Sequence, residues 1–224
     1  MRRNIFFLLL ILVVALNIQA QTSRVKITTD KGAFIVVLYD DTPIHRDNFL
    51  HLVQDGYYNG ILWHRVIRNF MIQTGDSTSR HARPEALFGE EDVPYTLPAE
   101  IIYPAHYHHR GALAAARESD DINPERRSSG AQFYVVTGAK VPSSRMTDIR
   151  AYVSRMTHNE VRIPHALAED YAVRGGAPHL DGQYTVFGEV VEGMDVVEAI
   201  SVVPTDRNDR PRQDIRIITA EIME

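Results

Sequence analysis

Residues 62–76 of the chain read Leu-Trp-His-Arg-Val-Ile-Arg-Asn-Phe-Met-Ile-Gln-Thr-Gly-Asp. Two apolar runs flank a central Arg-Asn pair, and this pattern predicts two short strands joined by a turn. Because side chains alternate between the two faces of a strand, Trp63 and Arg65 are expected on one face of the first strand. Met71 and Gln73 share a face of the second strand for the same reason. The stretch therefore predicts an arginine and an amide beside a shallow apolar surface.

Similar apolar runs, separated by Gly, Pro and Asn, recur on both sides of this stretch. Residues 24–28 and 33–39 are joined by a turn and predict a hairpin. Including that hairpin, the expected strands are residues 24–28, 33–39, 62–66, 71–74, 111–115, 133–137, 186–190 and 215–220. Short strands spread along one chain in this way are typical of a β-barrel or a sandwich.

Two helices interrupt the strands. The first opens at Thr42-Pro43, where Thr42 is expected to be the N-cap and the proline to occupy the first helical position. The second covers residues 194–201, in which apolar side chains recur on one side. Helices of this kind can close the ends of a barrel. The pattern therefore predicts a mainly β fold of eight strands, in which two α-helices close the open ends of a barrel.

Residues 141–176 do not follow the rhythm of the strands. Thr147 can cap a helix in which Ile149 and Val153 share one face. Pro164 can begin a second helix, which a Gly-Gly pair would end. We interpret residues 141–176 as a helical insertion in a loop of the barrel, and the sequence gives no indication of its role.

The first twenty residues have the pattern of a secretory signal peptide. A short basic start precedes an apolar run of 12 residues, 5–16, and the small residue Ala20 offers a cleavage point. A helix of that run rises about 18 Å, which is shorter than a hydrocarbon core of about 30 Å. We therefore expect residues 1–20 to be removed and residues 21–224 to form one exported domain, periplasmic or extracellular, without stable membrane insertion. An uncleaved membrane anchor is the alternative.

Composition excludes several classes of function. The formal net charge is −5, and a mildly acidic chain does not favour binding to a phosphate backbone, so no nucleic acid partner is expected. The chain has no cysteine, which excludes disulfides, thiolate nucleophiles and thiolate metal sites. Phosphate-binding Gly-rich loops and the Gly-x-Ser-x-Gly and His-Glu-x-x-His motifs are also missing from the sequence.

Histidines offer one alternative chemistry. His106 and His108 would face the same side of a strand and, with His109, could bind a metal ion. Histidines in a loop without a nearby pair of carboxylates are more often solvated or packed. We therefore expect no metal site and no cofactor, and we keep a metal-binding protein as an alternative hypothesis.

Two further stretches carry polar residues among apolar ones. Residues 128–137 read Ser-Ser-Gly-Ala-Gln-Phe-Tyr-Val-Val-Thr, in which Gln132 and Tyr134 would project from the same face of a strand. Residues 178–190 read Pro-His-Leu-Asp-Gly-Gln-Tyr-Thr-Val-Phe-Gly-Glu-Val. Considered separately, either stretch could belong to the core of a barrel.

Together and in this order, the three quoted stretches resemble the cyclophilin family of peptidyl-prolyl cis-trans isomerases. The resemblance covers the chain from about residue 24 to the last expected strand. It implies a closed eight-stranded antiparallel β-barrel capped by two α-helices, in agreement with the expected strands and helices. It implies an enzyme that accelerates rotation about X-Pro bonds in proline-containing polypeptides, with no cofactor. It implies Arg65 as a catalytic residue and Gln73 as the side chain that orients Arg65 or the substrate. The residues implied for substrate binding are Phe70, Met71, Ala116, Arg117, Gln132, Tyr134, His179, Leu180 and Tyr184.

Four positions depart from the common pattern of that family, and one of them is Thr74, which stands where glycine is common. Tyr134 stands where phenylalanine is frequent, and His179 and Tyr184 stand where many eukaryotic members have tryptophan and histidine. That tryptophan supports cyclosporin binding in the family, so sensitivity to the drug is left open. We expect a monomer that assists the folding of exported proteins. A non-catalytic peptide-binding or chaperone module on the same barrel is the alternative.

Overall fold

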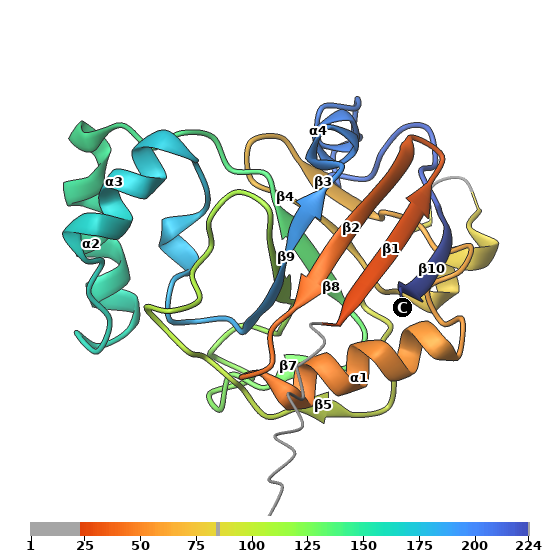
Figure 1. Cartoon of the computed structure of the whole chain (residues 1–224), viewed down its shortest axis with the longest axis horizontal. Coiled ribbons are helices and arrows are strands. Elements are labelled where there is room, and N and C mark those ends of the chain that lie inside the picture. Colours follow the sequence, from red (N-terminus) through yellow and green to blue (C-terminus); the bar gives the residue numbers. More distant parts are fainter. Residues whose placement is uncertain (1–22, 84–85, 224) are drawn as a thin grey trace, which may run out of the picture.

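The computed structural model describes residues 23–83 and 86–223 (Figure 1). Within these ranges, eight antiparallel strands form one sheet in the order β10-β1-β2-β9-β6-β8-β4-β3. The strands of this sheet are β1 (Arg24–Thr29), β2 (Gly32–Leu38), β3 (Arg65–Ile67), β4 (Met71–Thr74), β6 (Ala112–Ala115), β8 (Phe133–Val136), β9 (Val186–Glu192) and β10 (Ile217–Met223). Two shorter strands, β5 (Thr96–Leu97) and β7 (Ser128–Ser129), pair separately. Every strand expected from the sequence has a counterpart in the large sheet.

The sheet is open, so the prediction of a closed barrel was wrong. Its edge strands β3 and β10 do not pair with each other in the described part of the chain. One isolated bridge, Leu62 to Arg216, joins the segments that precede them, and the Trp63 amide donates to the Ile215 carbonyl at 2.9 Å. Strand β3 has only three residues. Among the described strands it pairs with β4 alone, so the contact is not continued into a ladder that would close the sheet.

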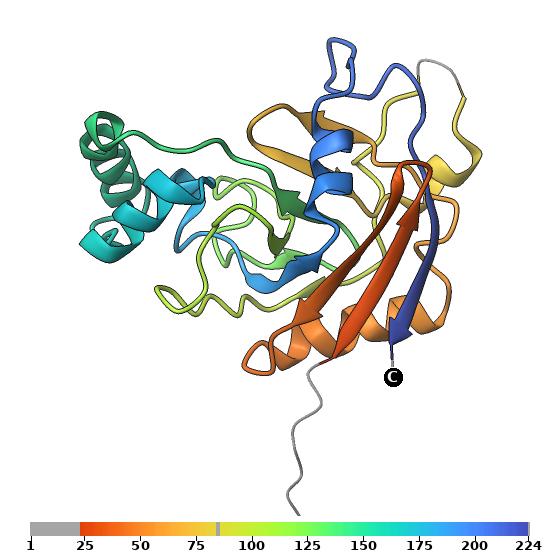
Figure 2. The same ribbon diagram turned by 45° about the horizontal axis from the view of Figure 1, so that its top comes forward.

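The two helices expected at the ends of the strands are present. Helix α1 (Pro43–Gln54) and helix α4 (Met194–Ser201) lie at opposite ends of β1 and β2 (Figures 1 and 2). Phe49 of α1 and Val197 of α4 belong to the same buried core cluster. Both helices therefore cover the sheet by burying their apolar faces on it.

Thr42 is the N-cap residue of α1 and Pro43 is its first helical residue, as predicted, but the side chain of Thr42 does not cap the helix. The Thr42 hydroxyl donates to the Tyr39 carbonyl and makes no capping bond. The Glu100 carboxylate instead accepts from the backbone amides of Ile44, at 3.1 Å, and His45, at 2.9 Å. A carboxylate at a helix N-terminus satisfies free amide groups and is stabilised by the helix dipole. The cap therefore comes from a residue far away in the sequence.

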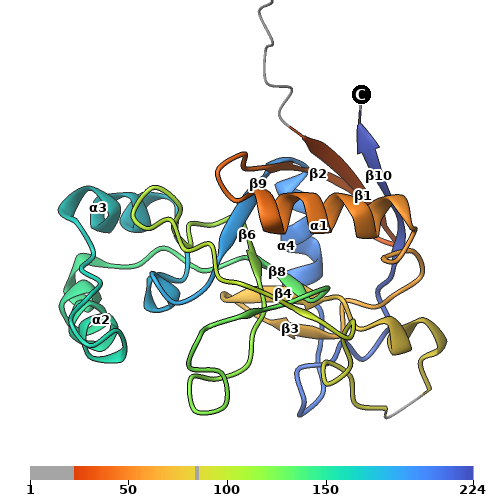
Figure 3. The ribbon, with the colours of Figure 1, turned by 90° about the horizontal axis from the view of Figure 1, so that it is seen from below.

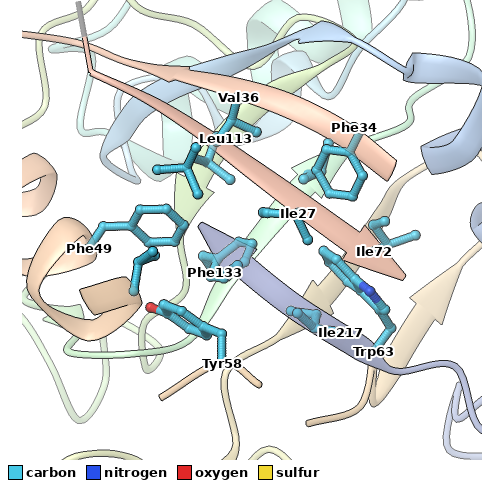
Figure 4. Packing of buried hydrophobic residues seen from close by; sticks show 14 of the residues in the cluster. Ile27, Phe34, Val36, Phe49, Tyr58, Trp63, Ile72, Leu113, Phe133 and Ile217 are labelled. Carbon is cyan, nitrogen blue, oxygen red and sulfur yellow. The ribbon is translucent and has the colours of Figure 1, made fainter. Parts of the chain in front are cut away.

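The core lies on one face of the sheet, around Phe133 (Figure 4). The Phe133 ring meets the rings of Phe49, Tyr58 and Trp63 edge-on, at centroid distances of 5.2, 5.3 and 5.9 Å. Because neighbouring side chains alternate, Tyr134 of the same strand faces away from this core and joins a second buried cluster. One face of the sheet thus packs on the core, and the other face carries the residues of the candidate site.

Residues 141–176 contain two helices, α2 (Ser143–Met156) and α3 (His165–Val173). Helix α2 begins before Thr147, so the predicted cap at Thr147 was wrong; the residue that precedes the helix is Pro142. The two helices lie side by side at one end of the molecule and bury Val153 and Tyr171 in a cluster of their own (Figures 1 and 3). The predicted signal peptide, residues 1–20, lies outside the described residues. No helix in the described ranges is long and apolar enough to cross a membrane.

The free energy of unfolding is expected to depend on pH through His64, whose side chain is buried. Neither of its ring nitrogens has a hydrogen-bond partner among the described residues. Burial lowers the pKa of His64 to about 4, whereas an unfolded histidine has a pKa of about 6.5. The unfolded chain therefore takes up this proton first. The contribution of His64 to stability is complete above about pH 6.5 and is lost as the pH falls, at up to about 1.4 kcal/mol for each pH unit.

We expect His64→Leu to reduce the decrease in the free energy of unfolding between pH 7 and pH 4.5. The measurement is urea unfolding followed by the fluorescence of Trp63, the only tryptophan of the chain, which is buried in the fold. His51→Leu is the matched control because His51 is an exposed residue of α1. If His64→Leu and the unmodified protein lost stability in parallel on acidification, the buried neutral histidine would not be the cause.

Candidate active site

A row of side chains crosses the face of the sheet opposite the core. Arg65 of β3 pairs with Gln73 of β4, Gln73 pairs with Tyr134 of β8, and Tyr134 pairs with Ala114 of β6. Residues directly opposite each other on neighbouring strands project from the same face of a sheet. Segments far apart in the sequence therefore place an arginine, an amide and a phenol next to one another.

A cavity of about 130 Å³ lies along this row. It brings together nine of the eleven site residues named from the sequence; its lining is formed by Arg65, Phe70, Met71, Gln73, Ala116, Arg117, Tyr134, Leu180 and Tyr184. The other two, Gln132 and His179, do not line this cavity. The roles of all eleven remain predictions, but their arrangement gives a small hollow with aromatic and aliphatic walls and a guanidinium group at it.

Arg65 is held by a chain of side-chain amides. Its Nη1 donates to Gln73 Oε1 at 3.2 Å, and Gln73 Nε2 donates to Gln132 Oε1 at 3.0 Å. Gln132 Nε2 in turn donates to the carbonyls of Gly89, at 2.9 Å, and Glu91, at 3.1 Å. Two carbonyl partners fix which end of the Gln132 amide is the donor, and this fixes Gln73 with its oxygen toward Arg65. Gln132 thus fixes the orientation of the Gln73 amide, although it does not line the cavity itself.

The other side of Arg65 faces an acidic residue. Arg65 Nε lies 3.8 Å from Asp209 Oδ2, and both side chains are nearly half exposed. An exposed ion pair of this length contributes little to stability. The Asp209 carbonyl also accepts from the Val66 amide at 2.8 Å, which ties the loop around Asp209 to β3. Arg65 is therefore bracketed by two partners while its charged group remains accessible to solvent.

Aromatic rings form much of the cavity surface. The Tyr134 and Tyr184 rings meet edge-on with their centroids 6.1 Å apart. Phe70 packs against His179, with centroids 5.1 Å apart. Burial lowers the pKa of His179 below its ordinary value. His179 therefore supports the wall formed by Phe70 in a largely neutral state at pH 7.

A larger groove of about 630 Å³ adjoins the cavity and shares Gln73, Ala116 and Arg117 with it. The Arg117 guanidinium lies 4.5 Å from the centroid of the Tyr184 ring and forms an ion pair with Asp120 at 2.6 Å. The Ala116 amide donates to the Gln132 carbonyl at 2.9 Å, and the Ala116 carbonyl accepts from the Ser129 amide at 2.8 Å. Ala116 and Arg117 were expected on the segment that contacts the backbone of a bound peptide, and this expectation stays a prediction.

The three histidines considered for a metal site point to different partners. His106 Nε2 lies 2.7 Å from Asp41 Oδ1, and His109 Nδ1 lies 2.9 Å from the Arg110 carbonyl. His108 is buried and contacts Asp181. Among the described residues, no group of three or more His, Cys, Asp or Glu side chains is arranged to hold a metal ion. This geometry does not support the metal-binding hypothesis.

Sequence reasoning missed the residues behind the cavity. The Tyr134 hydroxyl lies 3.0 Å from His108 Nε2, and the other ring nitrogen of His108 lies 3.1 Å from Asp181 Oδ1. His108 was considered only as a metal ligand, and Asp181 only as part of a motif. Their contact joins residues 73 positions apart. The one available signal was the position of Asp181 directly after Leu180, which lines the cavity.

Comparisons with known proteins agree with the geometry. A family model described as cyclophilin type peptidyl-prolyl cis-trans isomerase/CLD matches residues 24–222. A Staphylococcus saprophyticus protein named as a peptidyl-prolyl cis-trans isomerase is 33% identical, over 93% of this chain and 97% of that protein. A Streptococcus pyogenes protein named as a bifunctional phosphatase/peptidyl-prolyl cis-trans isomerase is 34% identical over 90% of this chain, which spans only 39% of that longer protein.

Solved structures share the fold. The crystal structure of a Cryptosporidium parvum cyclophilin type peptidyl-prolyl cis-trans isomerase matches with a TM-score of 0.62 at 23% identity, covering 91% of this chain and 98% of that one. A second structure of that protein, determined in the presence of the dipeptide Ala-Pro, matches with the same TM-score at 24% identity, covering 90% of this chain and 99% of that one. With the family model and the relatives, the conclusion is that the chain belongs to the cyclophilin-type peptidyl-prolyl cis-trans isomerase family.

Proposed function

We propose that the chain isomerises X-Pro bonds in polypeptides with Arg65 as its catalytic residue, and that it assists the folding of exported proteins. The observation that carries the proposal is the position of the Arg65 guanidinium at a cavity that Phe70, Met71 and Leu180 also line. The proline ring of a substrate would occupy this cavity. The carbonyl that precedes the proline would remain free to rotate.

The chemistry requires only differential binding of a twisted amide. Amide resonance gives the X-Pro bond a rotation barrier of about 18–20 kcal/mol, although the two planar isomers differ little in free energy. Resonance is lost in the twisted state, and the prolyl nitrogen becomes a hydrogen-bond acceptor. A guanidinium group that donates to this nitrogen stabilises the twisted state more than either planar state, which accelerates rotation. Guanidinium suits this role because it stays protonated and its donors are rigidly placed.

Substrate binding would strengthen the contact to Arg65. The side chain is nearly half exposed in the free protein, so water competes for its donors. A proline ring in the cavity would displace part of this water and lower the local dielectric, in which a charged hydrogen bond is stronger. The bond from Arg65 to Gln73 limits the conformations that must be lost on binding. A rate gain of about 10⁵ corresponds to about 7 kcal/mol, a plausible sum for these effects.

Arg65→Ala is expected to lower kcat/KM for a proline-containing peptide by roughly 10²- to 10³-fold in a protease-coupled isomerase assay, because the charged donor proposed for the twisted amide is removed. Arg68→Ala is the matched control, since Arg68 is an exposed arginine of the same hairpin that does not line the cavity. Both variants should unfold with similar midpoints. Near-normal turnover by Arg65→Ala would reject the proposed role of Arg65.

The pH–rate profile gives a second test of the mechanism. Burial raises the pKa of Tyr134 well above its ordinary value, and burial lowers the pKa of His179. Neither group therefore changes charge between pH 7 and pH 9. We expect kcat/KM to be nearly constant over that range, with any histidine-dependent change below pH 6.5. A steep inflection between pH 7 and pH 9 would show that a proton transfer missing from the mechanism limits the rate.

The proposed export rests on the N-terminal sequence. A basic start, an apolar run and Ala20 are the support for a signal peptide, after whose removal the domain would act outside the cytoplasm. Expression of the full chain in a bacterial host should therefore give a mature protein that begins at Gln21, found by mass spectrometry of the periplasmic or secreted fraction. Recovery of the intact chain from the membrane fraction would favour the uncleaved anchor instead.

The larger groove supports a second candidate function, peptide binding without catalysis. Its volume of about 630 Å³ offers room for a polypeptide segment next to the cavity, whatever chemistry Arg65 performs. The same Arg65→Ala variant separates the two functions. Suppression of aggregation of an unfolded protein that Arg65→Ala retains in full, together with negligible isomerase activity of the unmodified chain, would favour the chaperone module.

A further inference from the structure

A buried polar chain runs from Tyr134, which lines the cavity, through three side chains that do not line it. It begins at the Tyr134 hydroxyl, passes through His108 to Asp181, and ends at Tyr171 of helix α3. The Tyr171 hydroxyl lies 2.8 and 2.9 Å from the two carboxylate oxygens of Asp181. His108 is 1% exposed, and Asp181 and Tyr171 are fully buried. This relay, Tyr171–Asp181–His108–Tyr134, connects the helices of residues 141–176 with the cavity.

The chemistry of the groups sets the direction of the bonds to Asp181. Burial and the Asp181 carboxylate raise the pKa of Tyr171 well above its ordinary value, so its hydroxyl stays protonated and donates. The carboxylate can only accept, so His108 Nδ1 carries the proton between them. The backbone amide of His108 donates to the same oxygen at 3.0 Å. With Nδ1 directed to the carboxylate, the other ring nitrogen of His108, Nε2, bonds the Tyr134 hydroxyl at 3.0 Å.

The relay controls which part of Tyr134 meets a ligand. Tyr134 lines the cavity, but its hydroxyl is bonded to His108, which does not line it. A bound ring would therefore meet an aromatic surface and not a free hydroxyl group. Asp181 directly follows Leu180, which also lines the cavity. The Asp181 carboxylate therefore holds two parts of the lining, Tyr134 through His108 and Leu180 through the backbone. Both parts of the lining thus depend on one buried carboxylate.

We propose that His108 and Asp181 are positioning residues of the proline-binding cavity, and that Tyr171 couples helix α3 to Tyr134 in the lining of that cavity. This proposal rests on the proposed function, in which the cavity holds the proline ring of the substrate. It gives residues 141–176 a role that the sequence did not indicate. The same contacts also stabilise the fold, so a test must measure their effect on ligand binding and not on stability alone.

Tyr171→Phe is the central variant because it removes only the hydroxyl that donates to Asp181, at a residue outside the cavity. Tyr107→Phe is the matched control: the Tyr107 hydroxyl bonds Asp170 of α3 at 2.7 Å and makes no bond to Asp181. Each substitution is made in the unmodified chain and in a Tyr134→Phe background, in which the relay no longer has a hydroxyl at its end. The readouts are the Kd of an Ala-Pro-containing tetrapeptide by NMR titration, kcat and KM for the same peptide, and thermal unfolding.

In the unmodified chain, Tyr171→Phe should weaken peptide binding roughly three- to tenfold, mainly through Kd and KM, while Tyr107→Phe changes them by less than about twofold. In the Tyr134→Phe background, Tyr171→Phe should have almost no effect on Kd. The proposal is overturned if Tyr171→Phe weakens binding equally in both backgrounds. Equal effects of Tyr171→Phe and Tyr107→Phe on binding would overturn it as well, because they would indicate a general loss of stability.

Two provisions keep the test decisive. If Tyr171→Phe does not unfold cooperatively, His108→Gln replaces it in the same two backgrounds, with the same loss of coupling expected. The proposed function is judged separately, from the unmodified chain. If that chain neither binds nor isomerises the peptide, the proposed function fails and this proposal falls with it. If the unmodified chain binds and isomerises the peptide, but Tyr171→Phe changes Kd equally with and without Tyr134→Phe, only the relay is rejected.

Discussion

The site depends on one constraint, which is that a guanidinium group is held at the edge of an apolar hollow without being neutralised there. Gln73 holds Arg65 from one side at 3.2 Å, and Asp209 lies 3.8 Å away on the other. A closer carboxylate would compete with a substrate for the same donors, and a free arginine would lose more conformational entropy on binding. The arrangement keeps the charge available and its position restricted.

The sheet makes this arrangement possible because its two faces are separated. Alternation sends Phe133 into the core and Tyr134 into the site from adjacent positions of one strand. Register then sets Arg65, Gln73 and Tyr134 side by side across three strands. Core packing therefore fixes the site indirectly: a one-residue slip of β4 would exchange Gln73 for a core residue.

The sequence predicted most of the fold and most of the residues that line the cavity. The strands follow from the alternation of side chains along them, and the lining residues follow from the motifs shared with the family. Prediction from the sequence failed where contacts join distant segments. Trp63 was expected beside Arg65, but the chain before β3 is not a strand, so alternation does not apply and Trp63 lies in the core. The cap of α1 by Glu100 and the contact of His108 with Asp181 are likewise invisible in local sequence. The closed barrel failed because strand pairing at the two edges depends on three-dimensional geometry.

The central claim is that the proline ring binds in the cavity beside Arg65. It is tested most directly by intermolecular nuclear Overhauser effects between an isotope-labelled protein and an Ala-Pro-containing peptide. If the ring binds there, we expect contacts from the proline ring protons to Met71, Tyr134 and Leu180, with exchange between the cis and trans peptide signals in the same sample. Proline contacts confined to the larger groove, around Tyr95 and Ile122, would contradict it.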